Sequence, residues 1–257
     1  MTFGEHLEVL RRMLFRIIAV TCILSIIFFC CKDTVWAMLI APSEYDFTTY
    51  QLIEKTASLF GIDFHFEKFH VDLIATDLSS QFMTHITTSV YLGLLGASPY
   101  ILYELFRFVS PALYENEKKH SIAIATTIYI LFIAGVLMSY FILFPVSFRF
   151  LGTYSVSETI RSTITLDSYI GTFTTLTFVM GIVFQLPVIM FVLAKMGFIS
   201  SHILAKYRKH AIIPNRLLGF AWIYALLEEW ILFGFVTIPL YLLYEASIRI
   251  VKMVERN

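Results

Sequence analysis

The chain has 257 residues, of which 58% are hydrophobic and only 15% are charged. Soluble domains carry roughly 25% charged residues, so this composition excludes an ordinary soluble protein and predicts an all-α polytopic membrane protein. The formal net charge of zero does not select a class of partner. In a membrane protein the distribution of charge between loops matters more than its sum.

The first predicted element is a short amphipathic helix at the membrane interface, over residues 1–12. A first span follows over 13–31, and its single charge, Arg16, lies near the start, where it reaches the interface by snorkelling. The Arg11-Arg12 pair before this apolar run has the outline of an export signal. We interpret the pair as a cytoplasmic topology anchor, because no small-residue cleavage site follows and five more apolar runs come later.

Residues 32–81 form the longest polar region and are expected to be an outer loop. A turn is predicted at residues 41–43, and a short helix is predicted over 50–60. The spacing of His65 and His70 does not by itself support a metal site. We therefore expect neither a metal nor a cofactor.

Five further apolar runs are candidates for membrane spans, because a helix of about 17–25 apolar residues can cross a hydrocarbon core of roughly 30 Å. These predicted spans are 82–109, 121–144, 168–194, 211–227 and 230–250. With the first span they form one membrane domain over residues 1–257. Pro145 is expected to end the third span, whereas Pro99, Pro187 and Pro239 lie inside spans and bend them.

Two polar features of these spans have simple local interpretations. Glu104 and Arg107 are spaced i, i+3 near the end of the second span, which predicts a local ion pair at the interface. Gln185 precedes Pro187 in the fourth span. Its amide is predicted to satisfy a backbone carbonyl that the proline kink frees.

The Lys and Arg residues set the orientation. With the N-terminus inside, the inner segments hold most of the Lys and Arg residues, whereas the outer loops hold few. The positive-inside rule therefore predicts that both termini are cytoplasmic.

A short charged island, Ser110–His120, separates two long uncharged runs. It is predicted to be the polar turn of a transmembrane hairpin. Its carboxylates Glu115 and Glu117 then lie where water meets lipid and are placed to receive a cationic ligand. A simpler interpretation is that Glu117 is a solvated loop charge, offset by Lys118 and Lys119.

No catalytic motif occurs in the sequence: GxSxG, HExxH, a Walker loop and a dinucleotide fingerprint are all missing. The predicted second, third, fourth and sixth spans also lack a charged residue near their middle, which an ion-coupled transporter usually needs. Both observations disfavour an enzyme and a pump.

Several stretches, in the same order along the chain, are similar to motifs of one protein family. They are His6-Leu7, Leu10–Arg12, Ile74–Asp77, Pro99–Tyr103, Phe108–Tyr114, Glu117–Lys119, Ser139–Phe141, Phe144-Pro145, Asp167–Tyr169, Phe184–Val188, Lys206–Arg208 and Ile238–Glu245. The chain resembles the TatC family, the signal-receptor core of the twin-arginine protein translocase. The most specific piece is Pro-Ala-Leu-Tyr-x-x-Glu at 111–117.

The resemblance implies a core receptor subunit of the twin-arginine translocation (Tat) system, which binds the Arg-Arg signal peptides of folded precursor proteins. It implies six transmembrane helices in a curved, concave bundle, and a translocation site driven by the proton-motive force in the bacterial cytoplasmic (inner) membrane. The implied partners are TatA- and TatB-like single-span proteins and the signal peptides, in an oligomeric complex within the lipid bilayer, with no nucleic acid.

The resemblance places signal recognition on the cytoplasmic face, in the N-terminal segment and the first cytoplasmic loop. The implied signal-peptide-binding residues are Glu8, Leu10, Arg11, Pro111, Tyr114 and Glu117. Gln185 is implied as an intramembrane polar residue. Glu117 matches the family's signal-binding carboxylate. A carboxylate accepts the planar guanidinium fork bidentately, which Lys cannot reproduce, so such a site prefers Arg-Arg to Lys-Lys.

The sequence departs from the family pattern at three places. Val9 stands where the family usually has Glu, and Glu8 is one residue earlier, a rotation of about 100° on a helix. Gln185 stands where the family often has Glu. Residues 214–235 contain no Pro-Pro-Asp turn. Two alternatives stay open: a homologue impaired in its last two spans, and a small-molecule secondary transporter, which would show internal repeats and a polar midplane site.

Overall fold

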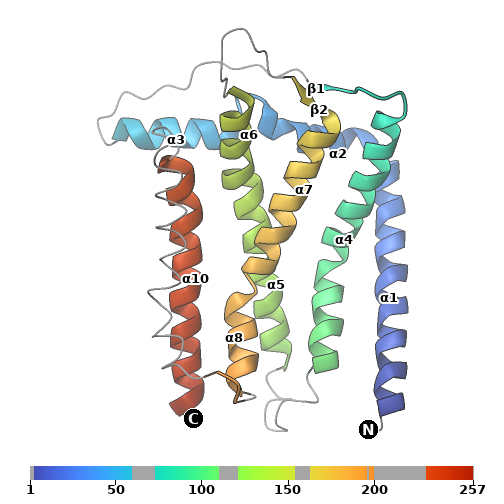
Figure 1. Cartoon of the computed structure of the whole chain (residues 1–257), viewed down its shortest axis with the longest axis vertical. Coiled ribbons are helices and arrows are strands. Elements are labelled where there is room, and N and C mark those ends of the chain that lie inside the picture. The colour runs from blue at the N-terminus through green and yellow to red at the C-terminus, as the bar shows by residue number, and fades with distance from the viewer. Residues whose placement is uncertain are drawn as a thin grey trace. The chain divides into compact units, whose positions relative to one another are not determined.

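The computed structural model describes residues 3–59, 73–109, 121–153, 163–195, 197–199 and 230–256, and most of them are helical (Figure 1). The α-helices are α1 (Phe3–Cys30), α2 (Lys32–Ile40), α3 (Thr48–Leu59), α4 (Ser80–Val109), α5 (Ser121–Met138), α6 (Phe144–Thr153), α7 (Leu166–Val183), α8 (Leu186–Lys195) and α10 (Trp230–Arg256). A 3₁₀ turn, η1, covers Ala41–Ser43, and a π-helical segment, η4, covers Ser139–Leu143.

Three helical stretches of the described chain are long and apolar enough to cross a membrane: Leu7–Cys30, Thr126–Gly152 and Leu166–Lys195. They overlap the first, third and fourth predicted spans. Helices α4 and α10, with 30 and 27 residues, occupy the ranges of the second and sixth predicted spans. The range of the fifth, 211–227, lies outside the described residues.

The N-terminal segment differs from its prediction. Instead of a separate interfacial helix followed by a span, one helix runs from Phe3 to Cys30. The reason is local: after Gly4 the sequence contains no Gly or Pro up to Cys30, so no residue interrupts the backbone hydrogen bonds. The polar first turns are therefore a rigid extension of the first span.

The third and fourth predicted spans also have different ends. Pro145 does not end the third span, because the chain passes through the π-helical η4 into α6, and Pro145 occupies the first turn of α6, where a missing N–H is tolerated. The fourth predicted span is two helices, α7 and α8. They are separated by a turn at Phe184-Gln185, just before Pro187.

The polar region after α1 is more ordered than its sequence suggested. The predicted turn is confirmed as η1, and the predicted short helix as α3. Helix α2 was not predicted. Neither was the two-stranded parallel sheet, in which β1 (Leu73–Ile74) pairs with β2 (Ile164–Thr165). His65 and His70 lie outside the described residues.

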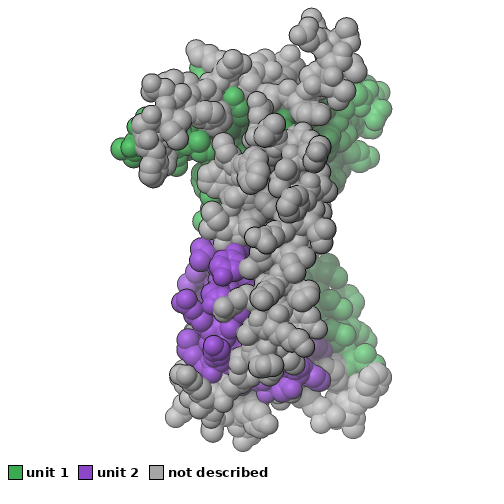
Figure 2. All heavy atoms as spheres, turned by 60° about the vertical axis from the view of Figure 1, so that its left-hand side comes forward, with its two compact units in different colours: residues 1–104, 137–178 green, residues 105–136, 179–257 purple. Residues whose placement is uncertain are grey.

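The chain divides into two compact units, residues 1–104 with 137–178 and residues 105–136 with 179–257 (Figure 2). In the first unit, α2 and α3 run across the direction of α1 and α4 (Figure 1). Its core joins α2, η4, α6 and α7 through Val35, Leu39, Tyr140, Phe144, Phe148, Tyr169, Ile170 and Phe173. Aromatic rings meet edge to face there, for example Phe144 and Tyr169 at 5.0 Å between centroids.

Three tyrosine hydroxyls join the elements of the first unit by donating to backbone carbonyls of α2 and α6. Tyr50 donates to Pro145 at 2.8 Å, Tyr140 to Met38 at 2.8 Å, and Tyr169 to Leu39 at 2.7 Å. Burial raises the pKa of Tyr50, against a smaller opposite effect of Arg149. The Tyr50 hydroxyl therefore stays protonated at neutral pH and remains a donor.

The second unit depends on close helix approach. A Cβ atom on Gly135 would lie 2.6 Å from the carbonyl oxygen of Met180, and one on Gly181 would lie 2.7 Å from the ring of Phe132. Real Cβ atoms essentially never come so close, so both contacts require glycine. A second apolar cluster, centred on the buried Ile248 and Val251 of α10, packs against Met190 and Ala194 of α8.

Candidate functional site

The first turns of α1 carry an exposed acid with two arginines. The Glu8 carboxylate accepts a hydrogen bond from Arg12 Nε at 3.0 Å, and Arg11 Nη1 lies 3.7 Å from its other oxygen. Their spacings, i+4 and i+3, place all three on one side of the helix. The Glu8 side chain is 45% exposed and the arginine side chains about 70%. Such exposed pairs contribute about 0–1 kcal/mol, so Glu8 can exchange partners readily.

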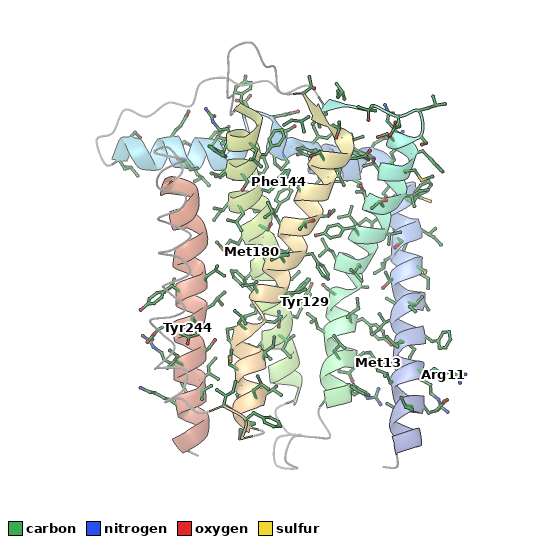
Figure 3. All side chains as sticks on the ribbon, viewed as in Figure 1. Arg11, Met13, Tyr129, Phe144, Met180 and Tyr244 are labelled. Carbon is green, nitrogen blue, oxygen red and sulfur yellow. The ribbon has the colours of Figure 1, made fainter. Side chains whose placement is uncertain are left out.

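The residues next to Glu8 show which side of α1 faces α4 and which side faces away from it. Arg11 points away from α4, and its guanidinium lies 6.0 Å from the Phe15 ring centroid, a cation–π distance (Figure 3). Leu10 is half-buried. Met13 lies on the side toward α4 and is 3% exposed (Figure 3). The polar end of α1 is therefore anchored by Met13 and offers its charges to solvent.

One turn further along α1, Arg16 makes an ion pair with a different helix. Its Nη1 lies 3.1 Å from Oε1 of Glu104 on α4, and the Tyr100 hydroxyl donates to the same oxygen at 2.9 Å. The Glu104 side chain is 5% exposed and that of Arg16 48%. The predicted local pair of Glu104 with Arg107 is wrong: Glu104 faces α1, where the Arg16 guanidinium supplies the positive charge that a buried carboxylate requires.

Close packing of α1 against α4 brings this pair together. A Cβ atom on Gly93 of α4 would lie 2.7 Å from the backbone nitrogen of Ser25 on α1, and one on Gly96 would lie 3.1 Å from the Phe28 ring. The absence of side chains at Gly93 and Gly96 lets the two backbones approach, as small residues do in membrane helix pairs. Ser25 turns its hydroxyl back to the Thr21 carbonyl at 2.7 Å.

Gln185 lies in the turn between α7 and α8 and is buried. Its Nε2 donates at 3.0 Å to the carbonyl of Ile128, on α5. The prediction that this amide satisfies a carbonyl freed by the proline kink is therefore wrong, because the acceptor is the carbonyl of Ile128. The amide reaches an adjacent helix of the same unit, and the turn satisfies itself through backbone bonds such as Val188 N–H to the Gln185 carbonyl at 3.0 Å.

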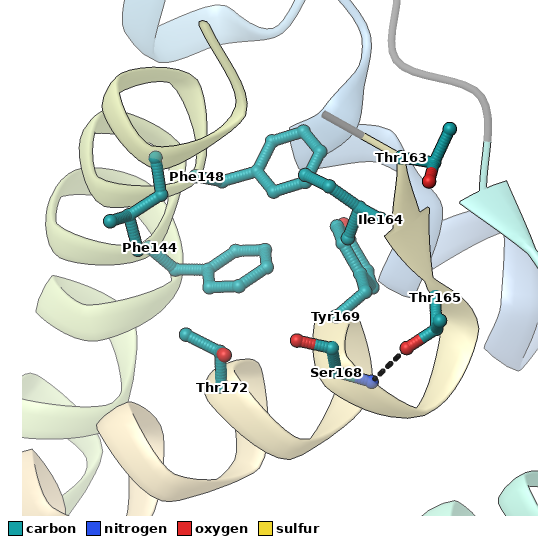
Figure 4. A pocket seen from close by; sticks show the side chains of 9 residues that line it. Phe144, Phe148, Thr163, Ile164, Thr165, Ser168, Tyr169 and Thr172 are labelled. Atoms are coloured by element: carbon teal, nitrogen blue, oxygen red, sulfur yellow. Dashed lines mark hydrogen bonds between the residues drawn. The ribbon is translucent and has the colours of Figure 1, made fainter. Parts of the chain in front are cut away.

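A cavity of about 290 Å³ lies in the first unit between α6 and the start of α7 (Figure 4). Phe144, Phe148 and Tyr169 form its apolar wall, and Thr165 and Ser168 add polar atoms. The Ser168 N–H donates to Thr165 Oγ1 at 3.2 Å, which caps α7. Among the described residues, those that line it carry no charged side chain.

The comparisons with known proteins decide the family. A model of the family "Sec-independent protein translocase protein (TatC)" matches residues 5–224. The chain belongs to the TatC family. The match includes the acid-arginine turns of α1, the charged island and Gln185. As a TatC protein, the chain belongs to protein transport by the Tat pathway, as a membrane translocase component.

Curated TatC relatives match over nearly the whole chain. The Sec-independent protein translocase protein TatC of Blattabacterium sp. subsp. Periplaneta americana (strain BPLAN) is 34% identical, over 100% of this chain and 97% of the relative. TatC of Carboxydothermus hydrogenoformans is 31% identical over 99% and 94%. A crystal structure of the twin arginine translocase receptor TatC superposes with a TM-score of 0.68 at 30% identity, covering 96% of this chain and 98% of that one.

The residues expected at the TatC signal site divide into two groups. Glu8, Leu10 and Arg11 share the first turns of α1. Pro111, Tyr114 and Glu117 lie outside the described residues, in the island between the last residue of α4 and the first residue of α5.

Sequence reasoning missed the Arg16–Glu104 pair. A signal was present, because each residue is a charge within a predicted span, and such charges usually find a partner inside the bundle. The i, i+3 neighbour Arg107 offered a nearer partner in sequence and concealed the contact between helices.

Proposed function

We propose that this chain is the core receptor subunit of a Tat system and binds the Arg-Arg signal peptides of folded precursors. The observation that carries the proposal is the full-length likeness, in sequence and structure, to the crystallised receptor TatC. The exposed Glu8 supports it chemically, because this carboxylate already holds two adjacent guanidinium groups of its own chain. An Arg-Arg ligand presents the same two groups.

In the proposed mode of binding, carboxylates at the inner membrane face receive the two ligand arginines. Glu117 in the island is the principal acceptor, Glu8 is the second, and Leu10, Arg11, Pro111 and Tyr114 shape the surface around them. A guanidinium offers a planar fork of donors that pairs with both carboxylate oxygens, whereas a Lys ammonium is a compact point charge. Discrimination between Arg-Arg and Lys-Lys therefore follows from geometry as well as from charge.

The membrane arrangement is part of the proposal. The domain spans residues 1–257, with six membrane helices in a concave bundle and both termini in the cytoplasm of a bacterium, within its inner membrane. The excess of Lys and Arg in the inner segments supports this orientation. TatA- and TatB-like single-span proteins join the chain in an oligomeric complex, and the proton-motive force drives transport. The chain itself is assigned no catalytic step.

The direct test is binding of signal peptides to the purified full chain in lipid nanodiscs. An Arg-Arg peptide should bind at least about tenfold more tightly than its Lys-Lys twin, a difference of ~1.4 kcal/mol. Glu117→Gln should remove that preference without changing the melting temperature, because the sequence predicts that the island is a polar turn between two spans. Equal binding of both peptides to the unaltered chain would refute the receptor assignment.

A further inference from the structure

The Arg16–Glu104 pair joins α1, the helix that carries Glu8, to α4, the helix that precedes the island in the sequence. Arg16 follows Glu8 by two turns on α1, and Glu104 lies in the last turns of α4, just before the island begins at Ser110. Arg16 Nε also donates to the Arg12 carbonyl at 3.3 Å. A continuous chain of polar contacts thus runs from Glu8 through Arg12 and Arg16 to Glu104.

In this pair, a single oxygen of the Glu104 carboxylate makes all of the described hydrogen bonds. Oε1 of Glu104 accepts both hydrogen bonds, one from Arg16 and one from the Tyr100 hydroxyl. Tyr100 precedes Glu104 by one turn of α4, so it fixes the carboxylate in a single direction, toward α1. The side chain of Glu104 is 5% exposed. A buried carboxylate without a positive partner is strongly destabilising, so the ion pair holds Arg16 and its helix at this position.

Packing elsewhere does not replace the pair. The close contact at Gly93 lies eleven residues before Glu104 on α4, about 16 Å away along a helix axis. It fixes the distant part of α1 but leaves the polar first turns to be positioned by Met13 and by the ion pair. The pair gives α1 and α4 a hydrogen-bonded contact close to these first turns.

We propose that Arg16 and Glu104 are positioning residues that set the selectivity of the receptor for adjacent arginines. This inference rests on the proposed function. By holding the first turns of α1 at one position against α4, the pair fixes the position and direction of the Glu8 carboxylate within the first unit. Bidentate recognition tolerates errors of only about 0.5 Å and 10–20°, whereas a Lys ammonium tolerates more. Loosening the pair therefore lowers Arg-Arg binding more than Lys-Lys binding.

The decisive experiment measures both peptides on a set of variants in nanodiscs. Glu104→Gln and Arg16→Gln should each lower the ratio of Arg-Arg to Lys-Lys affinity about tenfold, while Lys-Lys binding changes little. The double exchange of Arg16→Glu with Glu104→Arg should restore at least part of the ratio. Glu44→Gln, an exposed acid in the turn after η1, is the matched control and should behave as the unaltered chain.

A distance measurement tests positioning without any ligand. Spin labels at Leu7→Cys and Tyr103→Cys, both exposed positions, report the separation of α1 and α4 in a background in which Cys22, Cys30 and Cys31 are replaced by Ala. The distance distribution should be narrow with the pair intact and broader with Glu104→Gln.

Two results would overturn the inference while leaving the receptor assignment intact. One is an unchanged affinity ratio and an unchanged distance distribution in the single variants. The other is tighter Arg-Arg binding by Arg16→Gln, because that would make Arg16 a competitor of the ligand at Glu104. If the unaltered chain does not distinguish the two peptides, the proposed function and this inference fall together.

Discussion

The roles of the two acids Glu8 and Glu104 differ because one side chain is exposed and the other is buried. Glu8 and Glu104 each accept a hydrogen bond from an arginine at about the same distance, 3.0 and 3.1 Å. Glu8 is exposed and paired within its own helix, so its contact adds little stability and is open to exchange. Glu104 is buried and paired with another helix, so it holds structure in place.

Glu8→Gln tests this contrast. The free energy of unfolding should change by less than about 1 kcal/mol, because the lost pairs are exposed. Binding of an Arg-Arg peptide should weaken, because an amide cannot accept a charge-assisted fork. Thermal unfolding and peptide titration of the same sample give both quantities. A lower melting temperature with unchanged binding would assign Glu8 to the fold instead.

The buried Tyr50 hydroxyl is expected to contribute to the stability of the fold. Tyr50→Phe should destabilise the first unit by about 1–3 kcal/mol, because the Pro145 carbonyl loses a buried donor. Each kcal/mol should lower the melting temperature by about 2–4 °C. Tyr103→Phe, at an exposed position of α4, is the control and should unfold as the unaltered chain does. Equal melting of both variants would contradict the assigned role of the bond.

The sequence motifs did not reveal these packing roles. Asp167 and Tyr169 belong to a family motif, and the structure gives both a packing role: Asp167 accepts from Ser80 and Thr84 on α4, and Tyr169 donates to Leu39. These hydrogen-bond partners are more than 80 residues apart in the sequence, so the hydrophobic periodicity of the sequence does not predict them.

At the scale of elements, hydrophobic runs predicted where helices lie but not where they break. The third and fourth runs are each divided, one by the π segment and the other by the turn at Phe184-Gln185. Each break comes just before a proline, Pro145 or Pro187, and both prolines can be read from the sequence. Whether the break is a π segment or a turn depends on how the helices pack. Helix α2 escaped prediction because Lys32 and Asp33 made its start look like a loop.

The close approach of α1 and α4 can be tested with two glycines. Gly93→Ala should lower stability, because the added Cβ would lie 2.7 Å from the Ser25 backbone nitrogen and the helices must separate. Gly171→Ala, whose Cβ would meet no atom within 4 Å, should be neutral or stabilising by up to about 1 kcal/mol. Melting temperatures of the two variants compare them directly. Equal effects would mean that the contact is not close.

At the scale of the whole molecule, composition identified a membrane protein and the motifs identified the family, which the comparisons confirm. The sequence placed the proposed acceptors on α1 and on the island. It did not reveal that the Arg16–Glu104 ion pair joins α4 to α1, because contacts between helices depend on which faces meet. The sequence shows both Glu8 and Glu104, but it does not show that Glu8 is exposed and Glu104 is buried.

The proposed orientation has a whole-molecule test. In the background without native cysteines, a membrane-impermeant thiol reagent should label Lys55→Cys on α3 in intact cells. Gly4→Cys, near the start of α1, should react only after the cells are permeabilised. Both expectations follow from the distribution of Lys and Arg. The opposite pattern of labelling would reverse the orientation and place the proposed site on the wrong side for precursors.

The most direct measurement is photo-crosslinking from a probe at Asn116, next to Glu117, to a precursor in native membranes. A precursor with an Arg-Arg signal should crosslink, and the same precursor with Lys-Lys should not. That result would establish a receptor whose island reads the ligand's guanidinium groups. Equal crosslinking of both precursors, or none with either from well-inserted protein, would contradict the receptor assignment.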